Sequence, residues 1–288
     1  VVWKVIRELT ADLSVPNRDW SWDAHRIASA LLGLKCMFSK QVRVRKLVSG
    51  LTSVVKTSNA TLNAQAIANA FYGLQNLQNL HPETRGLLAA LNEKLRASPR
   101  TKSLEGLEGA NLELAKLHNV QYELTDQNIG NALWGFKKMQ ADGSDPQEYH
   151  EVLESLELLA ERIDESTAQM SPRHIANGLY AMQHMNPRHP QVQKLLFVLS
   201  TKIQLCSQPF TGLDLGMSLF GLRLMDSSIM EVRLILLLLL QKANFSHMKL
   251  TEPELNMSIM GLVNATPWLR DWFLKVIAEK HPGMKLVD

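Results

Sequence analysis

The sequence has very little cysteine and no long apolar run. Only two of its 288 residues are cysteines, and Cys36 and Cys206 fit neither a disulfide framework nor the spacing of a metal site. We therefore expect a reducing compartment rather than a secretory one. The longest apolar run, residues 234–240, has seven residues, whereas a membrane helix needs about 20. This run predicts a buried helix, and we expect no membrane insertion.

Signs of catalysis are lacking as well. The nine histidines show no HExxH spacing, and no glycine-rich phosphate loop follows a predicted strand. The net charge of +3 permits a polyanionic partner without requiring one. We therefore expect a protein that is not an enzyme and that uses no metal or other cofactor.

What the sequence does contain is a motif that recurs along almost the whole chain. Its clearest copy, DQNIGNALWGFKKM, occupies residues 126–139. Related segments lie at residues 25–37, 65–77, 173–185, 213–225 and 254–265. Their central small residues, Gly33, Gly73, Gly135, Ala181, Gly221 and Gly261, are separated by 40, 62, 46, 40 and 40 residues. A period near 40 is typical of two-helix repeats. We predict an all-α fold, an α-solenoid of about six helix-turn-helix repeats.

The alignment also predicts the repeat boundaries. We expect a single domain over residues 1–288, with repeats at residues 21–60, 61–120, 121–168, 169–208, 209–248 and 249–288. Residues 1–20 resemble the second helix of an incomplete repeat, and because the chain begins with valine we expect a processed or partial species. The long second repeat is predicted to carry an insertion at residues 97–120, formed by a loop and an extra surface helix.

Helix start signals stand at one fixed place in every repeat. Four residues before the Ile or Leu of the motif there is a good N-cap residue, and the residue before it is apolar, as in a hydrophobic staple. The six caps are Asp23, Asn63, Thr125, Ser171, Thr211 and Thr251. The predicted second helices begin at Ser39, Pro82, Asp145, His189, Ser228 and Thr266.

A helical wheel separates the sides of the predicted first helix. Counted from the Ile or Leu as zero, offsets 0, +4, +7 and +11 form the core side. Small residues recur at offsets +1 and +6, which lie on the two flanks. Because glycine costs about 1 kcal/mol inside a helix, its return at one offset predicts close packing between neighbouring first helices.

The side opposite the core is polar and aromatic in repeats two to four. It collects offsets −2, +2, +5 and +9, which are Gln65, Asn69, Tyr72, Asn76, Gln127, Asn131, Trp134, Lys138, Arg173, Asn177, Tyr180 and His184. Rings can stack on bases, while amides and cations can bind base edges or phosphates, so this side is a candidate site for single-stranded RNA. Two other interpretations stay open: the rings can point into packing, and the three asparagines can form a structural ladder.

In repeats five and six the same side becomes mostly apolar. Its residues there are Met217, Phe220, Leu224, Met257 and Met260. A surface of this kind is typical of a contact with another protein, or of a surface that further chain covers.

The motif also resembles a known family. Its copies QNIGNALWGFKKM, QAIANAFYGLQNL and HIANGLYAMQHM are similar to the helical signature of octotricopeptide-repeat proteins, Q-x-hydrophobic-A/S-N-x-L-W-A-L, and the resemblance covers about residues 23–265. It implies an α-solenoid related in logic to pentatricopeptide and heptatricopeptide repeats. Matching the signature points to Asn69, Asn131 and Asn177 with Tyr72, Trp134 and Tyr180.

The resemblance further implies a location and partners. Such proteins act in mitochondria or chloroplasts, where they bind RNA for processing, stability or translation, and some are subunits of organellar ribosomes. We therefore expect a mitochondrial protein, or alternatively a chloroplast one, whose partners are single-stranded or ribosomal RNA and the protein subunits of a ribonucleoprotein. The alternative is a scaffold that binds proteins only.

Overall fold

The computed structural model describes residues 22–102, 105–245 and 249–280. Within these residues the chain forms helices and no strand, apart from an isolated bridge between Ala141 and Met185. The predicted all-α fold is confirmed. The helix predicted within residues 1–20 lies outside the described residues.

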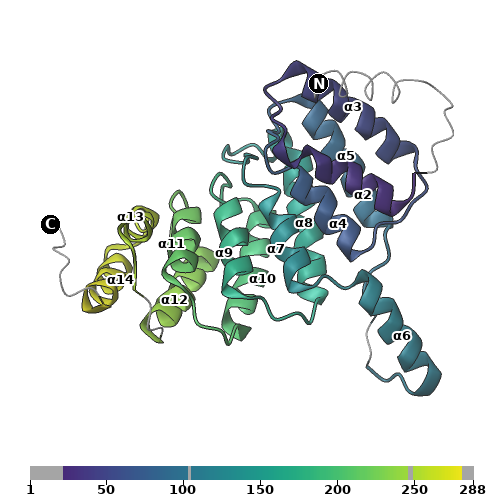
Figure 1. Cartoon of the computed structure of the whole chain (residues 1–288). Helices are drawn as coiled ribbons and strands as arrows, with labels where there is room; N and C mark the ends of the chain where they lie inside the picture. Colours follow the sequence, from purple (N-terminus) through teal and green to yellow (C-terminus); the bar gives the residue numbers. More distant parts are fainter. Residues whose placement is uncertain (1–21, 103–104, 246–248, 281–288) are drawn as a thin grey trace.

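The helices form two rows, and the chain alternates between them (Figure 1). The first row consists of α2 (Ala24–Leu32), α4 (Ala64–Gly73), α7 (Asp126–Trp134), α9 (Pro172–Ala181), α11 (Gly212–Gly221) and α13 (Glu252–Gly261). The second row consists of α3 (Val42–Thr57), α5 (Pro82–Ala97), α8 (His150–Glu165), α10 (Pro190–Leu205), α12 (Met230–Phe245) and α14 (Pro267–Lys280). Each helix packs against the preceding and following helices of its own row.

All six predicted residues stand at the N-cap positions of the first-row helices, although the side chain of Ser171 bonds His174 Nδ1 and does not cap the backbone. The side chain of Asn63, for example, accepts a hydrogen bond of 2.8 Å from the backbone N–H of Ala66. Thr125 and Asn128 bond reciprocally as a capping box. The second helices at Pro82, Pro190 and Pro267 begin within a residue of their predicted positions, because proline is favoured in the first helical turn.

Three second helices begin later than predicted. The helix α12 begins at Met230 rather than at Ser228. The segment Pro146–Tyr149 forms a separate 3-10 helix, η2, so α8 begins only at His150. At the start of the array, α3 begins at Val42 rather than at Ser39.

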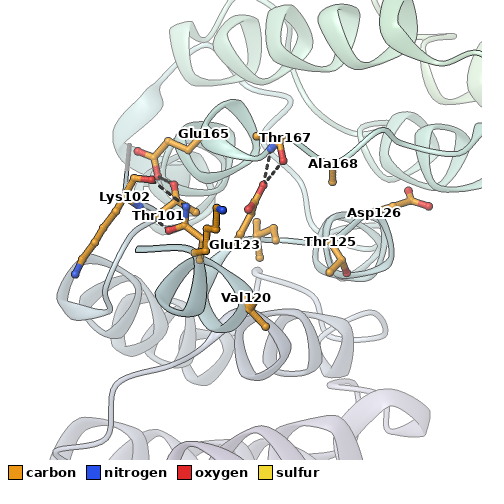
Figure 2. A pocket seen from close by; sticks show the side chains of 12 residues that line it. Thr101, Lys102, Val120, Glu123, Thr125, Asp126, Glu165, Thr167 and Ala168 are labelled. Carbon is orange, nitrogen blue, oxygen red and sulfur yellow. Dashed lines mark hydrogen bonds between the residues drawn. The ribbon is translucent and has the colours of Figure 1, made fainter. Parts of the chain in front are cut away.

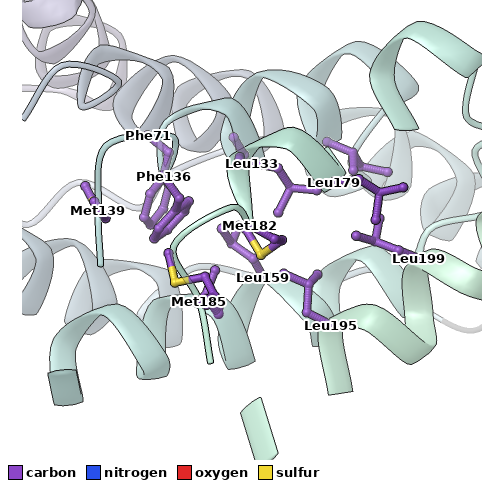
Figure 3. Close-up of a cluster of buried hydrophobic side chains, with 14 of the residues drawn as sticks. Phe71, Leu133, Phe136, Met139, Leu159, Leu179, Met182, Met185, Leu195 and Leu199 are labelled. Atoms are coloured by element: carbon purple, nitrogen blue, oxygen red, sulfur yellow. The ribbon is translucent and has the colours of Figure 1, made fainter. Parts of the chain in front are cut away.

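The core lies between the two rows, and Figure 3 shows part of it. Leu133 and Leu179 of the first row pack over Leu159 and Leu195 of the second, and all four are fully buried. Residues 234–240 lie in α12 and contribute to this core as predicted. None of the helices in the described part of the chain is long and apolar enough to cross a membrane.

The predicted core offsets are right up to +7 and wrong at +11. Gln140 stands at +11 in its repeat and is half-buried, whereas Met139, at +10, is fully buried. The reason is that the α-helix ends at the central small residue and tighter turns follow, in which Phe136 N bonds Leu133 O at 3.0 Å and Met139 N bonds Phe136 O at 2.8 Å. Three residues per turn place offsets +7 and +10 on the same side.

Glycines at offset +6 bring neighbouring first helices into backbone contact. A Cβ atom on Gly73, Gly135, Gly221 or Gly261 would overlap the backbone of the residue at +4 in the preceding first helix, which is Leu31, Phe71, Leu179 or Leu219 respectively. The predicted close packing is therefore confirmed at these positions. In α9, where Ala181 occupies +6, the close approach is made by Gly178, whose Cβ would lie 2.8 Å from Leu133 Cδ1. At Gly33, no atom of the described residues lies within 4 Å of this position.

Successive helices of the second row are joined by hydrogen bonds that the sequence analysis did not predict. A cation near the end of one helix donates to the C-cap carbonyl of the preceding second-row helix. The four pairs are Lys94 with Ser58, Arg162 with Ser98, Lys202 with Ser166 and Lys242 with Cys206. The terminal carbonyls of a helix have no partner within the helix, and a cation there also interacts favourably with the helix dipole.

Replacing Lys202 with methionine is expected to lower the free energy of unfolding by about 1 to 3 kcal/mol, because the buried carbonyl of Ser166 loses its charged donor. Urea unfolding followed by circular dichroism measures the loss. Lys56→Met is the matched control, since the Lys56 side chain at the end of α3 is exposed. An equal loss in both variants would contradict a role for the bond.

The insertion of the second repeat forms the extra helix that the sequence predicts. This helix, α6 (Gly109–Tyr122), projects from the two rows (Figure 1). Ala115 is its only buried residue. Three large apolar side chains are exposed on it, Leu114 by 63%, Leu117 by 68% and Val120 by 85%.

Candidate nucleic-acid interface

The predicted RNA-binding residues lie on the side of the first row that faces away from the core, which we call the outer face. None of the twelve is buried. Gln65, Gln127, Lys138 and Arg173 are exposed, and the other eight are half-buried. The wheel thus predicted the direction of these side chains correctly, across α4, α7 and α9.

Three rings of the outer face stack on one another along the row. The ring centroids of Trp134 and Tyr180 are 5.6 Å apart with an interplanar angle of 24°, and those of Tyr180 and Phe220 are 5.9 Å apart at 18°. We call these three residues the ring ladder. Lys137 Nζ lies 4.7 Å from the Trp134 ring centroid, and the Arg223 guanidinium lies 4.1 Å from that of Phe220. Both are cation–π distances.

The rings are therefore neither core residues nor free platforms. Phe220, which the sequence analysis assigned to a protein contact, continues the ladder of the predicted RNA-binding rings. Tyr72 stands outside it, since it stacks with no other ring in the described part of the chain.

A second ladder, made of amides and cations, runs beside the rings at offset +8. It consists of Gln75, Lys137, Gln183 and Arg223. The Oε1 atom of Gln75 accepts hydrogen bonds of 3.0 Å from both Lys137 Nζ and Trp134 Nε1. Gln183 Nε2 donates to the carbonyl of Lys137 at 3.2 Å, and Arg223 Nη1 donates to Gln183 Oε1 at 3.0 Å. This ladder joins the successive repeats from the second to the fifth.

Sequence reasoning missed this second ladder because the wheel assumes a continuous α-helix. Offset +8 lies beyond the end of the helix, in the tight turns, where the wheel no longer gives directions. The alternation of amide and cation at one offset, Gln75, Lys137, Gln183, Arg223, was the available signal.

The predicted amides divide into bonded and unbonded groups. Gln65 Nε2 donates to Asn69 Oδ1 at 2.9 Å, and Asn76 Nδ2 donates to the carbonyl of Lys35 at 2.7 Å. The side chains of Gln65, Asn69 and Asn76 are therefore hydrogen-bonded within the protein. Asn131 and Asn177 make no hydrogen bond through their side chains to any described residue, so their amides are available to a ligand. The described residues show no ladder of asparagines bonded to one another.

Charge is arranged differently on the two rows. The outer face carries Lys137, Lys138, Arg173 and Arg223, and among the described residues none of these four forms an ion pair. Two cations near the second row lie beside carboxylates: Arg100 Nη1 is 3.1 Å from Glu161 Oε2, and Lys194 Nζ is 2.8 Å from Glu161 Oε1. The exposed lysines Lys46, Lys56 and Lys275 of the same row form no ion pair with any described residue. The outer face therefore presents uncompensated positive charge.

The titration of the outer-face groups reflects this positive charge. Partial burial, and secondly the charge of Lys138, lower the pKa of Lys137. Burial likewise lowers the pKa of Arg223. Burial also lowers the pKa of His184, and the charges of Arg223 and Lys138 lower it further, while Asp142 acts in the opposite direction. Burial is the largest cause in all three groups, and neighbouring cations add to it for Lys137 and His184.

The predicted protein-contact residues are only partly exposed. Leu224 and Met260 are 58% and 52% exposed, and Met257 is half-buried. Met217 is only 8% exposed, so its predicted place on an open surface is wrong. A residue at offset +2 lies between neighbouring first helices and is partly covered by them, as the half-burial of Asn69 in its own repeat also shows. Met217 is covered from both sides, because α11 packs against α9 and α13.

A cavity of about 900 Å³ lies at the base of α6 (Figure 2), where Thr125 and Asp126 at the start of α7 also line it. Its carboxylates are already bonded. Glu123 Oε1 accepts from both the backbone N–H and the hydroxyl of Thr167 at 2.7 Å, and Asp126 Oδ2 lies 2.8 Å from His174 Nδ1. No group of three or more His, Cys, Asp or Glu within the described residues could hold a metal ion.

Comparison with known proteins finds no relative. No protein-family model matches the chain, and neither does any curated protein or any solved structure.

Proposed function

We propose that the chain is an α-solenoid of helix-turn-helix repeats that binds RNA on its outer face without catalysing a reaction. The observation that carries this proposal is a set of four cations that form no ion pair with any described residue, Lys137, Lys138, Arg173 and Arg223. Like charges held together destabilise the free protein, and an anionic ligand relieves that repulsion. RNA phosphates are the ligand that such a positively charged, elongated surface attracts most strongly.

We further propose a place in an organelle, the mitochondrion or alternatively the chloroplast. The support is the resemblance of the first helices to the octotricopeptide signature, together with the scarcity of cysteine. There the protein would act in RNA processing, stability or translation, or as a subunit of an organellar ribosome.

Fluorescence anisotropy with labelled RNA of about 20 nucleotides tests the proposal. We expect saturable binding at low salt, with an affinity that falls linearly on a log–log plot as the salt concentration rises. If no RNA, structured or unstructured, binds at low salt, the proposal is wrong.

The affinity for RNA is expected to rise as the pH is lowered, because His184 takes up a proton more readily beside bound phosphate than in the free protein. In the free protein the pKa of His184 is lowered, mainly by burial and then by Arg223 and Lys138. Bound phosphate brings negative charge and raises that pKa, so RNA binding takes up a proton and is favoured at lower pH. Anisotropy titrations between about pH 8 and about pH 5.5 should show a gain of a few-fold. His184→Gln should flatten this dependence, and an unchanged slope in that variant would exclude His184 as its source.

A protein scaffold is the second candidate function, and the exposed apolar side chains of α6 favour it. Replacing Leu117 and Val120 with serine should leave the free energy of unfolding within about 0.5 kcal/mol, because both side chains are exposed. If α6 binds a protein subunit, the double variant should lose that subunit on purification from its native organelle while keeping RNA affinity. Retention of every co-purifying protein would contradict this role.

A further inference from the structure

The rings of Trp134 and Tyr180 on the outer face already pack against other side chains on both of their sides. Tyr180 stacks on Trp134 of α7 and on Phe220 of α11, and because these helices flank α9 on opposite sides, both faces of its ring are covered. Trp134 has Tyr180 on the side of α9. On the side of α4 it has Lys137, which is bonded to Gln75 in that repeat. Two of the three rings that the sequence offered for base stacking therefore have no open face.

The ring ladder cannot open without breaking the packing of the row. A base inserted between two rings needs about 3.5 Å of additional separation. Gly221 holds α11 in backbone contact with α9 at Leu179, and Gly178 of α9 lies against the side chain of Leu133 in α7. Separating the rings would separate these helices. Tyr72 stacks with no other ring among the described residues, and a single ring cannot stack several successive bases.

The groups that are left for a ligand suit a backbone rather than bases. Lys138 and Arg173 are exposed cations, while Asn131 and Asn177 have amides without partners among the described residues. Recognition of single strands depends on splayed bases that stack on open rings. An RNA double helix has its bases stacked inside, and its wide, shallow minor groove presents phosphates and 2′-hydroxyls. Cations bind the former, and amides can bond the latter.

We infer that the ligand class of the outer face is double-helical RNA, bound through its phosphates and 2′-hydroxyls, with the ring ladder acting as a closed spine rather than as a base platform. This inference rests on the proposed function, because it specifies the RNA that the same face takes. The spacing of the ladder follows from the glycine contacts, and the polar groups beside the rings make the contacts.

Competition anisotropy with three probes tests the inference: an RNA duplex of about 20 base pairs, each of its separated strands, and a DNA duplex of the same sequence. The RNA duplex is expected to bind about tenfold more tightly than either strand or the DNA duplex. The double variant Asn131→Ala, Asn177→Ala should lose most of the preference for RNA duplex over DNA duplex. Asn111→Ala, on the exposed surface of α6, is the control and should keep it.

The outcomes separate the inference from the proposed function. If a single strand binds as tightly as the duplex, or more tightly, the inference is overturned and RNA binding itself stands. If the DNA duplex competes as well as the RNA duplex, the assignment to 2′-hydroxyls is wrong. If neither RNA form binds at low salt, the proposed function fails together with the inference.

Discussion

Replacing Gly135 with leucine is expected to lower the free energy of unfolding by about 3 kcal/mol or more. A Cβ atom at this position already overlaps the carbonyl of Phe71, which is backbone and cannot turn aside as a side chain can. The helices α4 and α7 would have to move apart, and the stacked pair of Phe71 and Phe136, whose ring centroids are 5.5 Å apart in the core beneath them, would separate as well. Urea unfolding measures the change as a shift of the midpoint.

Gly33→Ala is the matched control for this prediction. Gly33 occupies the same place in its repeat, but no atom of the described residues lies within 4 Å of its Cβ position. Its backbone is in the right-handed helical region, so alanine fits and is expected to be neutral or to stabilise by up to about 1 kcal/mol. If Gly135→Leu unfolded at the same urea concentration as the parent, close packing at offset +6 would not stabilise the protein.

The all-α fold and the arrangement of the first row could be read from the sequence because their signals are local. An N-cap such as Asn63 acts on the backbone three residues away, and a glycine such as Gly135 has a cost that only a close contact explains. Both signals recur at fixed offsets, so each repeat confirmed the others.

What could not be read is the spacing between repeats and the groups that bridge it. A wheel predicts that Trp134 and Tyr180 point the same way, but it does not predict that their centroids lie 5.6 Å apart. Lys202 lies 36 positions after the carbonyl that it binds, as Lys94 and Lys242 do for theirs. That shared separation is a periodic signal, visible only once the carbonyl at the end of each second helix is considered as a partner.

Met217 also shows what a helical wheel cannot predict. The wheel placed it on an open surface, but the helices on both sides of α11 leave it 8% exposed. Burial at the edge of a helix face is decided by how closely the neighbouring helices approach, which depends on residues of other repeats.

The triple variant Lys137→Gln, Lys138→Gln, Arg223→Gln is expected to bind RNA about 100-fold more weakly at low salt, because three uncompensated cations leave the outer face. Glutamine retains an amide N–H, so the bonds to Gln75 and Gln183 can persist and the fold is preserved. The slope of log affinity against log salt should fall in magnitude by about 0.7 to 0.9 for each phosphate contact that is lost.

The matched control changes the net charge equally at another place. Lys46, Lys56 and Lys275 are exposed lysines of α3 and α14, in the second row, and their triple replacement by glutamine should weaken binding only a few-fold. The comparison separates a site from a general effect of charge, because long-range attraction depends on the total charge whereas counterion release depends on contact with phosphates. If both triple variants lost affinity and slope alike, the outer face would hold no site. If the outer-face variant kept its affinity while remaining folded, RNA would bind elsewhere on the chain, and the exposed apolar residues of α6 and α14 would become the surfaces to test.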